Sequence, residues 1–155
     1  MEIMKLLFDL GFLFQNLTDL SYVRKFYILT ATTVITNTEL GITWQDALQD
    51  SFETYLVIAN RDETDEKFKC LLQGNKRLIN YILRTYTIDH AIVSAAKTAY
   101  VIQLIKNSQN EWQQYSSPEQ LKDLVIVHMA YPKIHKLKKS NPEAFFYWYH
   151  ALSLK

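Results

Sequence analysis

Residues 89–106 read DHAIVSAAKTAYVIQLIK, and this stretch decides the fold of the chain. It combines four small residues with large apolar residues that fall on more than one side of a helix: Ala91, Ala95, Ala96 and Ala99, with Ile92, Val93, Val101, Ile102, Leu104 and Ile105. A helix that is apolar on several sides is enclosed by other elements, and small residues let neighbouring helices approach closely. We therefore predict that Asp89–Lys106 is the central helix of the molecule.

Glycine and proline are scarce on either side of this stretch. The 155 residues include only three of each: Gly11, Gly41, Gly74, Pro118, Pro132 and Pro142. A sheet needs turns every several residues, and turns draw on glycine, proline, asparagine and aspartate. The long uninterrupted blocks therefore predict an all-α fold, a single-domain helical bundle of about six or seven helices that spans residues 1–155.

Two apolar segments open the chain. Ile3–Gln15 is apolar at nearly every position, so a helix there would bury most of its circumference against its own core or against a second chain, which leaves a homodimer open. The segment Leu20–Ile35 is rich in β-branched residues and is also compatible with a strand. We favour a helix because no glycine or proline lies between Phe12 and Leu40.

The next helices have recognisable starts. Thr43 precedes Trp44 and is followed three residues later by Asp46, a variant of the capping box, which predicts a helix to about Asn60. Acidic residues then stand where they would oppose the positive end of another helix dipole: Asp62, Glu63, Asp65 and Glu66. That helix is expected to break or end at Gly74-Asn75, and a further apolar stripe extends to Tyr86.

The last quarter contains two Pro-containing helix starts. Ser117-Pro118-Glu119 and Asn141-Pro142-Glu143 each place a capping side chain before a proline and an acid. They predict helices over Glu119–Tyr131 and Glu143–Leu152. Between them, after Pro132, lies a short basic segment, residues 133–139.

Composition limits the classes of function. Seventeen basic and sixteen acidic residues give a formal charge of +1, so no strong overall field draws the protein to nucleic acid or to an anionic membrane. Cys70 lies in an apolar stretch and cannot form an internal disulfide, which favours a buried thiol and a cytosolic setting. The apolar N-terminus is interrupted by charge and is interpreted as mature structure, and no apolar run is long enough to span a bilayer.

One pair of residues offers catalytic chemistry. In Arg84-Thr85-Tyr86-Thr87-Ile88-Asp89-His90, an Arg precedes a His by six positions at the start of a long helix. This pattern resembles the ribonuclease motif of the HEPN family, a resemblance that implies a dimer in which Arg84 and His90 act on a phosphodiester. The structural alternative places Arg84 near a helix end and His90 in a first turn, and we favour it.

A second pattern joins charge to aromatic rings. The basic residues Lys133, His135, Lys136, Lys138 and Lys139 are followed by five consecutive aromatic residues that include Trp148. Cations and flat rings together suit single-stranded nucleic acid. A helix distributes five consecutive rings around its circumference, however, so a solvated lysine cluster beside a docked helix is the interpretation we favour.

The sequence contains no familiar set of catalytic or metal ligands. His90, His128, His135 and His150 lack metal-ligand spacing, and no glycine-rich loop could hold a nucleotide. We therefore expect no metal and no cofactor. Tyrosine and tryptophan, by contrast, are common anchors of protein interfaces.

These observations lead to a hypothesis of function: a non-enzymatic cytosolic protein that binds another protein and covers its active or binding surface, as a small immunity protein, antitoxin or regulatory adaptor does. One of two charged runs would steer the contact, Asp62, Glu63, Asp65 and Glu66 or Lys133, Lys136, Lys138 and Lys139. The alternatives are the HEPN-like ribonuclease and a single-stranded nucleic-acid-binding protein that uses the lysines with Trp148.

Overall fold

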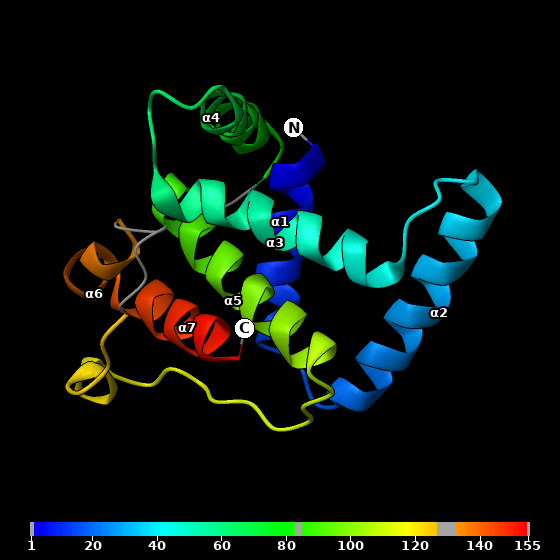
Figure 1. The fold of residues 1–155 in the computed structure, drawn as a ribbon. Helices are drawn as coiled ribbons and strands as arrows, with labels where there is room; N and C mark the ends of the chain where they lie inside the picture. The colour runs from blue at the N-terminus through cyan, green and yellow to red at the C-terminus, as the bar shows by residue number, and fades with distance from the viewer. Residues whose placement is uncertain (1, 83–84, 127–132, 155) are drawn as a thin grey trace.

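Helix α5 (Ile88–Lys106) lies at the centre of the computed structural model, which describes residues 2–82, 85–126 and 133–154 (Figure 1). It packs against α1 (Glu2–Phe14), α3 (Trp44–Asn60) and α7 (Pro142–Ser153). Twelve of its nineteen residues are buried, including all four alanines. The prediction of a central helix over residues 89–106 is confirmed.

The other α-helices are α2 (Leu20–Thr38), α4 (Glu66–Leu78) and the short α6 (Leu137–Ser140). Three 3-10 helices lie at Ile79–Tyr81, Pro118–Leu121 and Ile134–Lys136. One hydrophobic cluster takes residues from all seven α-helices, and the described part of the chain contains no strand. The predicted all-α helical bundle is therefore confirmed.

The smallest residues fix the distance between α1 and α5. A Cβ atom built on Gly11 of α1 would lie 2.1 Å from Ser94 Oγ of α5 and 2.7 Å from Ser94 Cβ. Only hydrogen fits at that point, so the two helices approach more closely than any larger residue would permit. The buried alanines of α5 continue this close packing.

An ion pair between a buried lysine and a partly exposed glutamate joins α5 to the aromatic helix α7. Lys97 Nζ lies 2.7 Å from Glu143 Oε1, and the lysine side chain is only 7% exposed. The same ammonium group lies 5.8 Å from the ring centre of Phe14 and 5.6 Å from that of Tyr147. The negative faces of these rings and the carboxylate compensate for the loss of water around the charge.

Helix α2 resolves the ambiguity between helix and strand in its β-branched segment. The hydroxyls of Thr33, Thr36 and Thr38 donate to the carbonyls four residues earlier, at 2.8, 2.8 and 2.7 Å. These bonds satisfy the threonine side chains inside a helix. Asp19 caps its start by accepting from the Tyr22 N–H at 3.1 Å. The capping box predicted from Thr43 and Asp46 is likewise present at the start of α3.

Three predictions from sequence are wrong. Helix α4 does not end at Gly74-Asn75, because both residues are buried and the helix continues to Leu78. It is followed by a single 3-10 turn, so the apolar stripe toward Tyr86 does not continue as helix at residues 82 and 85–86. Cys70 is exposed rather than buried, since α4 turns Phe68 and Leu71 inward.

A fourth prediction, the helix over Glu119–Tyr131, is also wrong. The structure has a 3-10 helix at Pro118–Leu121 and no regular helix over residues 122–126, while residues 127–131 lie outside the described part. Lys138 Nζ donates to the carbonyls of Lys122 and Leu124, at 3.2 and 2.8 Å. A side chain from α6 thus takes carbonyl groups that a continuing helix would have used.

Candidate protein-binding surface

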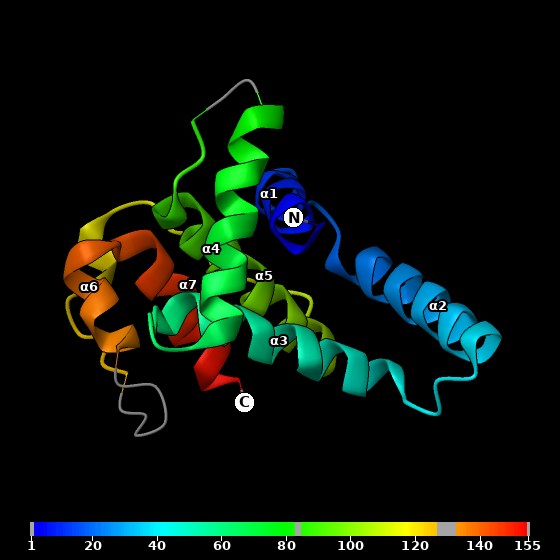
Figure 2. The ribbon, with the colours of Figure 1, turned by 90° about the horizontal axis from the view of Figure 1, so that it is seen from above.

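Helix α2 projects from the side of the bundle. Both ribbon views place it apart from the packed helices, with its free end away from α5 (Figures 1 and 2). All nineteen of its residues are described, and Leu20 alone is buried. A helix of this length normally buries a full apolar stripe against the core. The surface around α2 is therefore the most unusual feature of the molecule.

The exposed sides of α1 and α2 carry a set of large apolar side chains that we call the apolar face. On α1 they recur at spacings of three, four and three residues, and on α2 at four and three, so each helix presents one stripe. These side chains are between 39% and 63% exposed: Ile3, Leu6, Leu10, Leu13, Tyr22, Phe26 and Leu29. Exposed apolar patches larger than a few hundred Å² are rare on monomeric soluble proteins and mark interaction sites.

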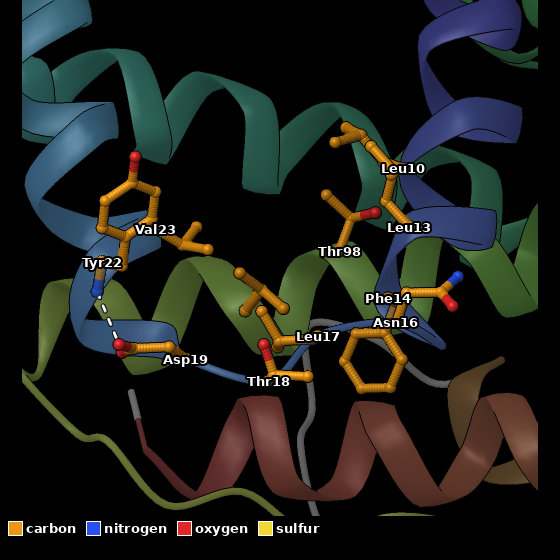
Figure 3. A pocket seen from close by; sticks show the side chains of 11 residues that line it. Leu10, Leu13, Phe14, Asn16, Leu17, Thr18, Asp19, Tyr22, Val23 and Thr98 are labelled. Atoms are coloured by element: carbon orange, nitrogen blue, oxygen red, sulfur yellow. Dashed lines mark hydrogen bonds between the residues drawn. The ribbon is translucent and has the colours of Figure 1, made fainter.

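A groove joins the two stripes. Its cavity of about 350 Å³ lies between the end of α1, the start of α2 and the side of α5. Figure 3 shows Leu10 and Leu13 on one side, Tyr22 and Val23 on the other, and Leu17 between them. Tyr22 and Val23 also line a shallower hollow with Phe26 farther along α2, so the apolar face continues from one helix to the next.

Polar contacts hold the base of α2 in place. The Arg24 guanidinium donates to Asn110 Oδ1 at 3.0 Å and also to the carbonyl oxygens of Leu104 and Gln109, near the end of α5. The Tyr27 hydroxyl donates to the Trp44 carbonyl at 3.4 Å. At the helix start, hydrogen bonds from the Ser21 hydroxyl and the Tyr22 amide lower the pKa of Asp19. Helix α2 is therefore oriented by contacts of its first half, and its second half extends into solvent.

The acidic and basic runs, which the sequence offers as alternative contacts, meet each other on the side of the bundle away from α2. Lys133 Nζ lies 3.9 Å from Asp62 Oδ1, and Arg61 forms an ion pair of 3.0 Å with Asp89. Hydrogen bonds from the Thr64 hydroxyl and amide, with a smaller effect of Lys133, lower the pKa of Asp62. Charges of both signs are mixed here, so neither run produces a separate field.

Asp65 and Glu66 of the acidic run stabilise the start of α4. Asp65 is the N-cap and accepts from the amides of Lys67 and Phe68, at 2.7 and 3.4 Å. Glu66 pairs with Lys69 one turn along the helix, at 2.6 Å. Glu63 is exposed. Two of the four acids are therefore accounted for by the local structure of α4.

The residues of the basic run and of the neighbouring aromatic helix also differ in their exposure. Lys136 and Lys139 are exposed, whereas Lys138 is used internally, with its Nζ also 5.8 Å from the Phe145 ring centre. Trp148 is completely buried and packs edge-on against Phe52 at 5.8 Å between ring centres. Its ring has no surface to offer a partner, which removes Trp148 from the candidate contact residues.

The catalytic candidates are only partly described. Arg84 lies outside the described residues. His90 is the third residue of α5 and completes a capping box: the Thr87 amide donates to His90 Nδ1 at 3.0 Å, and the His90 amide donates to the Thr87 hydroxyl at 3.4 Å. The imidazole also stacks on Tyr86, with ring centres 6.0 Å apart. These contacts give His90 a structural role at the helix start.

Residues 2–82, 85–126 and 133–154 contain neither a candidate metal site nor a helix suited to a membrane. This part of the chain contains no group of three or more histidine, cysteine or acidic side chains placed to hold a metal ion. Nor does any of its helices combine the length and the apolar character needed to cross a bilayer.

The sequence of α2 contains a signal for the apolar face. No charged residue occurs between Lys25 and Glu39, although thirteen residues separate them. A helix that emerges so far from its core normally carries charge on its solvent side. Comparisons with protein-family models, curated proteins and solved structures each found no match to this chain.

Proposed function

We propose that this protein is a non-enzymatic protein-binding module and that the apolar face of α1 and α2 is its contact surface. The observation that carries the proposal is a nineteen-residue helix with one buried residue and an apolar stripe in solvent. Burial of apolar area is the main source of free energy in protein association. A partner that covers this face removes it from water, and its own contact surface is covered in return.

The mechanism is occlusion by a helix whose base is held in position. The Arg24 contacts orient the first half of α2 before a partner arrives, so conformational entropy is lost mainly in its second half when the complex forms. The groove between Leu13 and Tyr22 can accept apolar side chains of the partner, as the central pockets of interfaces do. An immunity protein, an antitoxin and a regulatory adaptor all act through contacts of this kind.

The charged runs take a secondary part in this proposal. Lys136, Lys139 and Glu63 are exposed, and exposed charges chiefly change the rate at which partners meet. Neutralising them should slow association and reduce its salt dependence. Substituting the apolar face should instead accelerate dissociation, because that face supplies the buried area.

Affinity capture with matched variants tests the proposal. The tagged chain is produced in its native host beside an untagged copy, as wild type, as Phe26→Glu and as Val125→Glu. Val125 is 67% exposed and lies outside the apolar face, so it controls for the loss of any surface apolar residue. Mass spectrometry then identifies which chains are retained in stoichiometric amounts.

We expect wild type and Val125→Glu to retain the same protein, either the untagged copy or another chain, and we expect Phe26→Glu to lose it. Circular dichroism confirms that each variant is folded. If the Phe26→Glu variant retains everything that wild type retains, the apolar face is not the contact surface and the proposal fails.

A further inference from the structure

The apolar face restricts the nature of its partner. We infer that its occupant is a second copy of this chain, held in a two-fold symmetric dimer in which each α2 lies against the groove of the other copy. This inference rests on the proposed function and narrows it, because a second copy that occupies the apolar face takes the place of the separate protein that the face would otherwise cover. Four properties of the face favour a second copy over a separate protein.

The first property is charge. The stripe Tyr22, Phe26, Leu29 belongs to a helix with no charged residue after Lys25, and the nearest charges on α1, Lys5 and Asp9, are of opposite sign. A two-fold interface places the same patch against itself, so a strongly charged patch would repel its own copy. The side chains of the apolar face carry no charge, and the charges around them, which include Asp19 at the groove and Lys25 beside Phe26, are of both signs, so a two-fold contact has no such penalty.

The second property is area. Seven large apolar side chains that are roughly half exposed offer on the order of 800 Å² on each copy, which matches the contribution per partner of about 800 Å² in a standard-size stable interface. The groove of about 350 Å³ adds depth to this surface. The face is therefore large enough for a specific dimer without any other contact.

The third property is the total surface of the chain. The accessible area is 9661 Å², whereas a compact monomer of 18.3 kDa is expected to expose about 8,100 Å². The chain therefore exposes about 1,500 Å² more than a compact monomer of its mass, and the projecting helix α2 is one contributor to that excess. A second copy that covers the apolar face would remove part of it. Permanent interfaces between copies are also more apolar than surfaces that alternate between water and a partner.

The fourth property is the stability of α2 itself. Its second half is rich in threonine and other β-branched residues, which have modest helix propensity, and most helical stability in proteins comes from packing. Only its base is fastened to the bundle, through Arg24 and Tyr27. Contact with a partner along Phe26 and Leu29 supplies the packing that α2 lacks within its own chain.

In the proposed dimer, each copy contributes both its α2 stripe and its groove to the interface. The stripe of one α2 enters the groove formed by Leu10, Leu13 and Tyr22 of the other copy, and the reverse contact is identical by symmetry. Such a contact closes on itself, so it stops at two copies. The opposite side of the bundle, where Asp62 and Lys133 meet, stays exposed on both.

Light scattering coupled to size exclusion, with sedimentation equilibrium for the affinity, tests the inference on the purified full chain. Wild type and Val125→Glu should have twice the 18.3 kDa mass of the chain. Phe26→Glu and Leu29→Glu should each weaken the dimer by roughly 30-fold or more, as central interface residues do. Because neither residue is buried in the single chain, both variants should remain folded.

Hydrogen exchange on wild type alone gives a second measurement that needs no variant. The amides of residues 26–38 should become more protected as protein concentration rises through the dimerisation range, and those of α5 should not change. A dimer without that protection uses another surface and overturns the inference, as does an assembly that grows beyond two copies.

A wild-type chain that stays monomeric up to about 100 μM also overturns the second copy as occupant. The capture experiment then decides the proposed function separately. If wild type retains a different protein that Phe26→Glu loses, the apolar face is still a binding surface. If nothing is retained through that face, both proposals are wrong.

Discussion

At the scale of single residues, the contact between Gly11 and Ser94 makes the sharpest prediction. Alanine is the better helix former by about 1 kcal/mol, so Gly11→Ala would stabilise an isolated α1. In the bundle its Cβ would meet Ser94 Oγ at 2.1 Å and Ser94 Cα at 3.2 Å. The helices must separate, and we expect a net loss of about 1–3 kcal/mol in the free energy of unfolding, measured with urea.

A double variant provides the control. Gly11→Ala combined with Ser94→Gly moves the methyl-sized group from one helix to the other and should recover part of the stability lost in Gly11→Ala. Ser94→Gly alone removes the acceptor of the Tyr86 hydroxyl, which lies 3.3 Å from Ser94 Oγ, and should itself be destabilising. A Gly11→Ala protein as stable as wild type would mean that the helices are not this close.

At the scale of one helix, the end of α2 carries an unfavourable residue. Glu39 has φ 52° and caps the helix in the left-handed conformation, which glycine adopts without steric cost. Glu39→Gly should therefore stabilise the second half of α2, by about 0.5–1 kcal/mol. Slower hydrogen exchange of the amides near Thr36 would report this gain.

The matched control is Glu39→Ala, which removes the same negative charge from the carboxyl end of the helix but keeps a Cβ atom. The effect of the charge on the helix dipole should appear in both variants. Only the glycine variant also relieves the backbone. Equal exchange rates in the two variants would contradict the role of the left-handed conformation.

The helices differ in how far their sequences determine them. The sequence of residues 89–106 and the capping box at Thr43 were sufficient to predict α5 and the start of α3, because apolar periodicity and local caps act within one segment. The helix predicted over Glu119–Tyr131 is not formed at residues 122–126, where Lys138 from a later segment binds two carbonyl groups. Contacts of that kind join distant segments, and no local pattern contains them.

The candidate site was less predictable than the fold. The apolar N-terminal segment predicted contact with its own core or with a second chain, but a segment that is apolar at nearly every position does not indicate which of its sides faces outward. The charged runs are conspicuous in the sequence because each concentrates charge of one sign. In the structure, however, Asp62 of one run lies beside Lys133 of the other. Trp148 likewise stands out in the sequence and is buried in the core. Exposure depends on the position of a whole helix, which residue types alone do not give.

At the scale of the whole molecule, His150 makes stability depend on pH. It lies among rings, with centres 4.5 Å away at Phe146 and 5.6 Å away at Tyr100, and burial lowers its pKa below the ordinary value of 6.5. Below pH 6.5 the unfolded chain takes up a proton at this histidine before the folded chain does. Stability is therefore lost as pH falls from 6.5 toward the lower folded pKa, and no further loss from this group occurs below it.

Thermal unfolding between pH 8 and pH 5 checks this prediction. His150→Gln should reduce the decrease in melting temperature on acidification, because the titrating group is gone. His135→Gln should behave as wild type does, since His135 is exposed. An unchanged pH dependence in His150→Gln would assign the acid sensitivity to other groups.

The packing of α1 against α5 also affects how the chain is made. More than 70 residues separate the end of α1 at Phe14 from the start of α5 at Ile88. Ribosomes add about 5–20 residues per second, so α1 emerges from the ribosome roughly 4–15 seconds before its main partner begins to emerge. Throughout that interval both sides of α1 are apolar and uncovered. The nascent chain is therefore a natural client for chaperones that shield hydrophobic segments near the exit of the ribosome.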